Sequence, residues 1–358
     1  MIDLAALSRS QLRDWLAESE HAAQADRLWT WLFRRGGRDF ADLGGHGRVP
    51  VSLLRRLETE ARVGRPDVVW EHRSGDGTIK WLLAMEDGQR VETVFIPDGR
   101  RGTLCVSSQI GCTLTCRFCH TGTQSLARNL TAGEIVGQVL FARDRIGDHE
   151  LTAETPRRLT NVVFMGMGEP FYNYDAVADA VRVLSDRDGL ALSRRRITVS
   201  TSGVVPEIER CGRELGVNLG ISLHAARDEL RERIMPLNRR YPLAELMRAC
   251  RAYPGLSNNR RILFAYTLLD GVNDSDDDAR DLVALLGRMP AKVNLIPFNP
   301  WPGAPYEPSP RERVRAFQEI LLAAGLAATV RETRGDDIAA ACGQLTTAGQ
   351  TEEFSEAW

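Results

Sequence analysis

Short apolar runs alternate with stretches of helical length between residues 103 and 330, and this alternation limits the fold more than any other feature of the chain. A run, a helical stretch and a further run is the pattern of parallel strands joined by crossover helices. The sequence therefore predicts an α/β fold, either an open doubly wound sheet or a partial (β/α)6 barrel. The expected strands are residues 103–106, 159–165, 196–199, 217–222, 262–268, 292–296 and 327–330, and the expected helices are 133–145, 175–184, 206–215, 242–253, 276–289 and 311–324.

In the first 98 residues the apolar residues are spaced differently. Apolar residues recur at helical spacing from Leu28 to Phe33 and again from Val51 to Ala61, which predicts a small helical unit. Three β-rich runs between residues 68 and 96 are separated by glycine turns and predict an antiparallel extension. The expected division is a helical accessory domain at 1–65, a β-rich extension at 66–98, a core at 99–346 and a C-terminal tail at 347–358.

Composition and charge place the chain among ordinary globular proteins. Hydrophobic residues make up 43% of its 358 residues, and the net charge is only −2. No run approaches the roughly 18 apolar residues of a membrane span, and the amino end lacks the pattern of a secretion signal, so we expect a cytoplasmic protein. Residues 187–261 carry 15 Arg against 8 acidic residues, which fits either a polyanion-binding surface or solvated helix faces.

Three cysteines at C-x3-C-x2-C spacing, Cys112, Cys116 and Cys119, follow the first expected strand of the repeat. Three thiolates hold three irons of a [4Fe-4S] cluster and leave the fourth iron open to a substrate or cofactor. The alternative is a structural zinc site with His120 as its fourth ligand. Structural zinc usually takes two separated ligand pairs, and this sequence contains no second Cys/His pair. The total of seven cysteines is odd, which fits a reducing compartment.

Polar residues gather where the expected strands end, which is the functional rim of a parallel barrel. A glycine-rich turn at residues 166–170 places a carboxylate where it can accept hydrogen bonds from an ammonium group. The other candidate rim segments are residues 200–203, 222–224 and 297–300.

These motifs together resemble the radical S-adenosylmethionine (SAM) enzymes, and among them the RlmN-type ribosomal RNA adenine methyltransferases. The sister Cfr-type enzymes share much of the pattern. The resemblance extends from about residue 25 to 346. It rests on the cysteine loop and on residues 90–94, 104–109, 128–130, 166–170, 222–225, 238–241, 271–274 and 340–345.

The resemblance implies a radical SAM core in which Cys112, Cys116 and Cys119 hold a [4Fe-4S] cluster. It also implies that SAM is contacted by seven residues of the rim: Gly168, Glu169, Ser200, Ser222, Leu223, His224 and Asn299. Two SAM molecules would be used per turnover. The first would methylate Cys342. The second, cleaved by an electron from the cluster, would give a 5'-deoxyadenosyl radical that takes a hydrogen atom from this methyl group.

The same resemblance implies how the product forms and leaves. The methylene radical would add to adenine carbon 2, which offers no acidic proton or lone pair for polar methyl transfer. Glu92 would then remove the ring proton, and the Cys105 thiol would attack Cys342 to form a transient disulfide and release the base.

The implied substrates are adenine 2503 of 23S ribosomal RNA and adenine 37 of some transfer RNAs. The helical accessory domain would help to hold the RNA. A flavodoxin or ferredoxin would supply electrons, and we expect a monomer that does not associate with membranes. Two alternatives stay open: carbon-8 methylation of the Cfr type by the same cysteines, and a non-catalytic, zinc-bearing RNA-binding protein.

Overall fold

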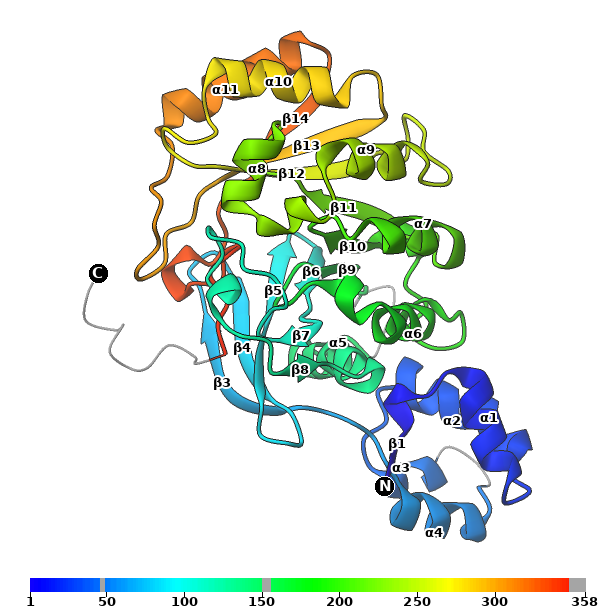
Figure 1. Ribbon diagram of the computed structural model, residues 1–358. Coiled ribbons are helices and arrows are strands. Elements are labelled where there is room, and N and C mark those ends of the chain that lie inside the picture. Colours follow the sequence, from blue (N-terminus) through cyan, green and yellow to red (C-terminus); the bar gives the residue numbers. More distant parts are fainter. Residues whose placement is uncertain (46–48, 150–155, 348–358) are drawn as a thin grey trace.

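A sheet of ten strands forms the centre of the molecule (Figure 1). The computed structural model describes residues 1–45, 49–149 and 156–347, so the expected tail lies outside the described residues from 348 onward. The strand order is β14-β13-β12-β11-β10-β9-β6-β5-β4-β3. No helix in the described part is long and apolar enough to cross a membrane.

Seven parallel strands make up most of this sheet, and each new strand is added beside the preceding one. Because the strand order never reverses, right-handed crossovers place their helices on one face, as in a barrel and unlike a doubly wound sheet. Strands β14 and β3 form the two edges, so the barrel is partial. The expected partial (β/α)6 barrel is confirmed.

The seven expected strands and six expected helices of this core are all present. The strands are β6 (Arg101–Cys105), β9 (Asn161–Phe164), β10 (Ile197–Thr201), β11 (Asn218–Ser222), β12 (Ile262–Leu268), β13 (Ala291–Pro297) and β14 (Ala327–Val330). The helices are α5 (Ala132–Ile146), α6 (Tyr174–Ser185), α7 (Val205–Glu214), α9 (Leu243–Arg251), α10 (Asp276–Leu286) and α11 (Arg311–Ala323). A short helix that we did not expect, α8 (Asp228–Ile234), follows β11.

Local chemistry fixes where these helices begin and end. Thr131 and Glu134 form a capping box at the start of α5, and Gly147 ends the helix in the left-handed conformation. Ser275 and Asp278 form the corresponding box at the start of α10. These signals explain why the bounds expected from the sequence are close to the observed ones.

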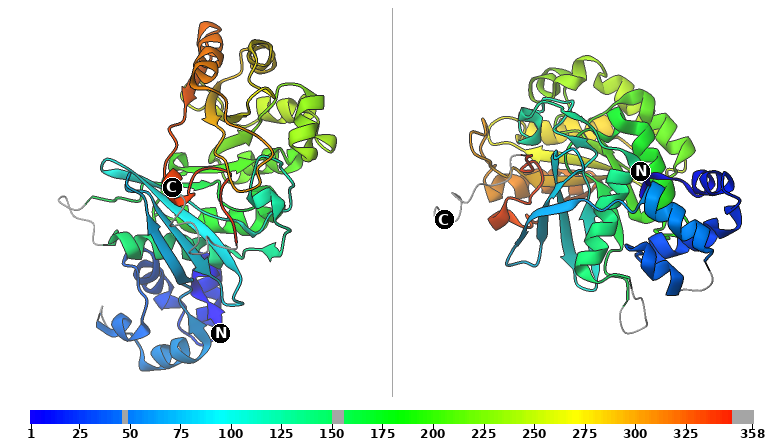
Figure 2. Two further views of the ribbon diagram at one scale, coloured as in Figure 1. Left: turned by 90° about the vertical axis from the view of Figure 1, so that its left-hand side faces the viewer. Right: turned by 90° about the horizontal axis from the view of Figure 1, so that it is seen from below.

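The antiparallel extension continues the main sheet. It consists of β3 (Asp67–Arg73), β4 (Ile79–Ala84) and β5 (Arg90–Asp98), and β5 pairs with β6 so that Val94 lies opposite Cys105. Strand β4 is buried over nearly its whole length, because the segment after β14 (residues 331–347, which include Cys342) covers one of its faces. Figure 2 shows that segment, in red, beside the cyan strands. The extension therefore provides the surface on which that segment docks.

The helical unit packs beside α5 and consists of α1 (Arg9–Ala17), α2 (Ala25–Trp29), a π-helical turn (Thr30–Arg34), α3 (Phe40–Gly45) and α4 (Val51–Glu60). The second expected helix is one residue too long. Ala61 instead begins the short strand β2 (Ala61–Arg62), which pairs with β1 (Ile2–Asp3). The Asp3 carboxylate accepts a hydrogen bond from Gly64 N at 3.0 Å, which stabilises this extended path. A small β1–β2 sheet thus ends the helical pattern.

Candidate active site

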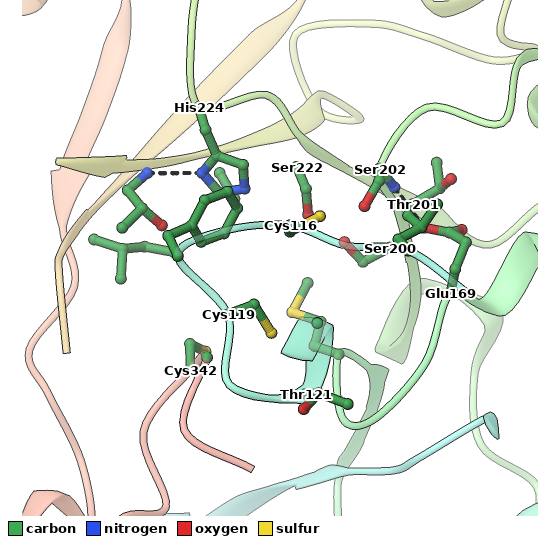
Figure 3. A pocket seen from close by; sticks show the side chains of 18 of the residues that line it. Cys116, Cys119, Thr121, Glu169, Ser200, Thr201, Ser202, Ser222, His224 and Cys342 are labelled. Atoms are coloured by element: carbon green, nitrogen blue, oxygen red, sulfur yellow. Dashed lines mark hydrogen bonds between the residues drawn. The ribbon is translucent and has the colours of Figure 1, made fainter. Parts of the chain in front are cut away.

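A cavity of ≈ 160 Å³ opens at the carboxyl ends of the parallel strands (Figure 3). A single buried water needs only about 10–15 Å³, so the cavity has room for a much larger group. Its walls come from the cysteine loop, from the ends of β9, β10 and β11, and from the segment after β14. The rim that the sequence predicts is therefore a real concave site.

All three cysteines of the loop line this cavity. Burial, with a smaller contribution from the neighbouring sulfur atoms, raises the pKa of Cys116 well above its usual value. Burial likewise raises the pKa of Cys112 to about 12. Three thiols that are this costly to ionise need a bound cation to become thiolates. Leu114 N also donates a hydrogen bond to Cys112 Sγ at 3.3 Å, the kind of contact that supports cluster ligands.

His120 does not join the three thiols. Its ring stacks on Trp301 with the ring centroids 4.9 Å apart and 1° between the planes, and its Nδ1 lies 3.4 Å from Gln344 O. Among the described residues, no three His, Cys, Asp or Glu side chains are placed to hold a single metal ion. The donor set of three thiols around an open cavity suits a cluster that binds at three corners better than one zinc ion.

Glu169 is anchored by the residue that follows β10 and by the turn that it begins. Its Oε2 accepts a hydrogen bond from Ser202 N at 2.8 Å, and its Oε1 accepts one from Phe171 N at 3.1 Å. Burial raises the pKa of Glu169, and the N–H of Ser202 and the hydroxyl of Thr201 oppose that shift. The site thus holds a fixed carboxylate that would be stabilised further by a cationic ligand such as an ammonium group.

The turn before Glu169 requires glycine. Gly168 has φ +95, and a Cβ at this position would lie 2.5 Å from Gln109 Cβ. Gln109 Oε1 in turn accepts a hydrogen bond from Glu169 N at 2.9 Å. The close contact between this turn and strand β7 (Gln109–Ile110) therefore sets where the carboxylate lies.

Ser200 lies beside Glu169 in the cavity wall, whereas Ser222 and His224 lie progressively farther from it (Figure 3). His224 Nδ1 accepts a hydrogen bond from Thr267 N at 2.9 Å, so the neutral ring carries its proton on Nε2. Burial, and to a lesser extent the positive charge of Arg231, lowers the pKa of His224 to about 3. His224 is thus a neutral hydrogen-bond donor at physiological pH.

Two expected rim residues lie outside the cavity wall. Leu223 is completely buried, and its backbone N donates a hydrogen bond to Ala265 O at 2.9 Å. Asn299 lines a smaller neighbouring cavity of ≈ 10 Å³, and its Nδ2 donates a hydrogen bond to Cys342 O at 3.1 Å. In this conformation Asn299 therefore positions the Cys342 segment.

The two cysteines expected to act in turnover converge beside the loop. Cys342 lines the cavity together with the three loop cysteines, and Figure 3 shows it close to Cys119. Cys105 ends β6; burial, with a smaller contribution from Cys342, raises the pKa of its thiol to about 12. Arg331 lies beside both thiols, and the negative charge of a Cys342 thiolate raises the pKa of its guanidinium. Two thiols distant in sequence thus share one positively charged neighbour.

Glu92 does not line the cavity. It is completely buried in β5, where its Oε1 lies 3.0 Å from Lys80 Nζ and its Oε2 accepts a hydrogen bond from Thr346 N at 2.9 Å. Lys80 Nζ also donates to Ala339 O at 3.0 Å. The pair therefore holds the segment that carries Cys342 on both sides of that cysteine.

Sequence reasoning missed Lys80 and Arg331. Lys80 interrupts an apolar strand and is one of only two lysines in the chain, which is a signal for a special environment. Arg331 directly follows the last expected strand, so the rule that places function at strand ends also applies to it.

Comparisons with known proteins agree with this geometry. The profile of the Radical SAM superfamily matches residues 106–283. The chain is 57% identical over 345 residues to the dual-specificity RNA methyltransferase RlmN of Rhodospirillum rubrum, with 96% of this chain and 80% of the relative covered. It is 56% identical to the RlmN of Rhodopseudomonas palustris strain TIE-1, with 98% and 90% covered. A radical SAM methyltransferase structure from Sphaerobacter thermophilus superposes with a TM-score of 0.89 at 45% identity, covering 96% of this chain and 99% of that one.

Proposed function

Because the chain belongs to the RlmN family of radical SAM methyltransferases, we propose that it methylates carbon 2 of adenine in 23S ribosomal RNA and in some transfer RNAs. The expected positions are adenine 2503 and adenine 37. One observation supports this proposal above the others: Cys342, from the segment after the last strand, lines the same cavity as the three cysteines of the loop. If Cys342 carries the methyl group, the carrier would lie beside the candidate cofactor site.

Cys112, Cys116 and Cys119 would hold a [4Fe-4S] cluster, and Glu169 would accept hydrogen bonds from the ammonium group of SAM. When bound, the cluster supplies one electron to SAM and so starts radical chemistry. Gly168 would let the backbone approach the cofactor. The hydroxyls of Ser200 and Ser222 and the Nε2–H of His224 would provide further polar contacts from the cavity wall. Two SAM molecules would be consumed in each turnover.

Cys342 and Cys105 would act as a pair of thiols. Cys342 would carry the methyl group and remain joined to the RNA base after carbon–carbon bond formation. Attack by Cys105 on the sulfur of Cys342 would release the base and leave a disulfide. The guanidinium of Arg331 beside both sulfur atoms would favour the Cys105 thiolate that this attack needs.

Glu92 would accept the ring proton of the tethered adenine. Burial raises the pKa of its carboxyl group, and the attraction of Lys80 opposes that shift. A carboxylate with a raised pKa is a stronger proton acceptor near neutral pH. The hydrogen bond from Thr346 N links Glu92 in β5 to the segment that carries Cys342, so proton removal and thiol chemistry would take place in directly connected parts of the fold.

RNA would contact the helical accessory domain and part of the Arg-rich stretch. Several of these arginines form ion pairs within the chain, such as Arg210 with Asp175 and Arg239 with Glu232. The turn of Arg194–Arg196 is exposed and is our candidate for a phosphate contact. We further propose a monomer in the cytoplasm that receives electrons from a flavodoxin or ferredoxin.

Nucleoside mass spectrometry tests the proposed reaction directly. The protein is purified without oxygen, reconstituted with iron and sulfide, and incubated with SAM, a reductant and 23S RNA or transfer RNA. We expect 2-methyladenosine in both RNAs. The product 8-methyladenosine would instead establish the Cfr-type reaction, and a colourless protein that binds one zinc ion and yields no methylated base would overturn the enzymatic proposal.

A further inference from the structure

Arg231 is a completely buried cation beneath the cysteine loop. It lies in α8, and its guanidinium donates hydrogen bonds to Ser202 O at 2.6 Å, Leu223 O at 3.1 Å and Asn238 Oδ1 at 2.8 Å. A fourth contact, at 3.2 Å, is made to Ser222 O. The donors are therefore satisfied by neutral oxygen atoms, from the ends of β10 and β11 and from Asn238 in the turn after α8.

The charge of Arg231 has no such compensation. Within the described part of the chain no carboxylate forms an ion pair with it, and Asp228 acts on it only at longer range. Leaving a buried cation without a countercharge costs several kcal/mol, so folded proteins usually provide one. Burial lowers the pKa of Arg231 only to about 10, so the group stays charged at neutral pH.

The cysteine loop lies against the end of the helix that carries this cation. Arg117 N, the residue after Cys116, donates a hydrogen bond to Ile234 O at 3.0 Å, at the end of α8. Met235, whose Sδ is 3.2 Å from Arg231 Nη2, lines the cavity. Cys116 is near enough that a charge on its sulfur would favour the protonated guanidinium of Arg231. A negatively charged group bound in the cavity would therefore supply the missing countercharge.

We propose that Arg231 is a positioning residue whose fixed charge balances the thiolate-bound iron–sulfur cluster and raises its reduction potential. This inference rests on the proposed function. Reduction makes the cluster more negative by one charge, and a buried cation beside one of its ligands stabilises the reduced form more than the oxidised form. The alternative is a purely structural role in which Arg231 joins the ends of β10 and β11 to α8.

A redox titration monitored by electron paramagnetic resonance separates the two roles in the cluster-loaded full chain. For Arg231→Gln we expect an about tenfold smaller equilibrium constant for one-electron reduction, which corresponds to a midpoint potential lower by about 59 mV. Arg231→Lys keeps the charge and should change that constant less than threefold. The matched control is Arg143→Gln, which removes a second buried arginine bonded to Phe33 O and Asp148 O, and should change the constant less than twofold.

A second pair of variants tests the charge if Arg231→Gln does not fold. Met235→Glu brings a carboxylate to the guanidinium, whereas Met235→Gln has the same shape without the charge. We expect the reduction equilibrium constant of Met235→Glu to be about tenfold smaller than that of Met235→Gln. Equal reduction equilibrium constants in the two Met235 variants would overturn this inference, as would an unchanged constant in cluster-loaded Arg231→Gln. Either result would leave the proposed function intact. Parent protein that takes up no iron and sulfide would overturn the proposed function, and this inference with it.

Discussion

Lys80 and Glu92 form an ion pair in which neither side chain is exposed to solvent, with Nζ 3.0 Å from Oε1. Burial disfavours the charge on both groups, and each group is stabilised in its charged form by the other. The pair also joins β4 and β5 to the segment after β14, because Lys80 donates to Ala339 O and Glu92 accepts from Thr346 N. One buried contact thus links a proposed proton acceptor to the proposed methyl carrier.

Replacing Lys80 should therefore destabilise the whole fold. In Lys80→Met we expect a loss of about 3–5 kcal/mol in the free energy of unfolding, because Glu92 is left buried without its partner. Urea unfolding followed by circular dichroism measures this. The control is Lys292→Met, which removes the exposed second lysine and should cost less than about 0.5 kcal/mol. The double variant Lys80→Met/Glu92→Gln should recover part of the loss; if it loses as much as the single variant, the ion pair is not the cause.

The two thiols should have separable effects on the RNA. Cys105→Ala should accumulate protein covalently joined to RNA, because the thiol that releases Cys342 is missing. Cys342→Ala, alone or combined with Cys105→Ala, should form no such adduct while still binding iron. A denaturing gel of reactions with labelled RNA shows the adduct, and Cys211→Ala, at a buried cysteine in α7, serves as the control. Free methylated RNA at normal yield from Cys105→Ala would remove that residue from the mechanism.

Gly168→Ala should weaken both the fold and cofactor binding. The residue has φ +95, and its new Cβ would overlap Gln109, so we expect a loss of at least about 2 kcal/mol in stability. The shifted turn should also lower the affinity for SAM by about tenfold. Gly147→Ala is the matched control, because Gly147 has φ +68 with nothing within 4 Å of the added Cβ. It should cost about 1–2 kcal/mol and leave SAM affinity unchanged in equilibrium binding assays. Equal SAM affinity in both variants would contradict the proposed contact.

His224 should make the protein sensitive to acid. The unfolded chain binds a proton at this residue below about pH 6.5, whereas the pKa of about 3 keeps the folded chain neutral there. Stability from this residue is thus fully present above about pH 6.5 and is lost as the pH falls, by about 1.4 kcal/mol per pH unit.

Urea unfolding at about pH 7 and pH 5 tests this dependence. From about pH 7 to pH 5 the free energy of unfolding of His224→Asn should fall by roughly 2 kcal/mol less than that of the parent protein. His21→Asn, at a partly exposed histidine of the helical unit, provides the comparison. The same loss in His224→Asn as in the parent would show that other groups determine the acid response.

Periodicity was enough to predict the alternating strands and long helices of the core, because each of them repeats a local apolar pattern. The choice between an open doubly wound sheet and a partial barrel depends on strand order, which periodicity does not contain. Helix α8 was missed since its seven residues are dominated by charged side chains and include only two apolar ones, Leu230 and Ile234. The pairing of Lys80 with Glu92 depends on strand register, which places Lys80 opposite Val94 and Leu82 opposite Glu92. No local pattern contains that information.

The candidate site, too, was predictable from the sequence only where local patterns specify it. The spacing of the three cysteines identified one wall of the cavity, and the strand-end rule identified Glu169 and His224 on the others. The rule also selected Leu223, whose side chain is buried away from the cavity, because it does not specify which way a side chain points. His120 looked like a metal ligand by its position next to Cys119, but its stacking on Trp301 depends on a loop far away in the sequence.

The order of synthesis gives the position of Cys342 a further consequence. A ribosome completes every parallel strand before it adds this residue, so the growing chain can fold its barrel before the sulfur proposed to carry the methyl group exists. A partly made molecule would lack this proposed carrier and could not attach itself to RNA through it. The late arrival of one side chain would thus protect the cell from covalent damage by unfinished enzyme.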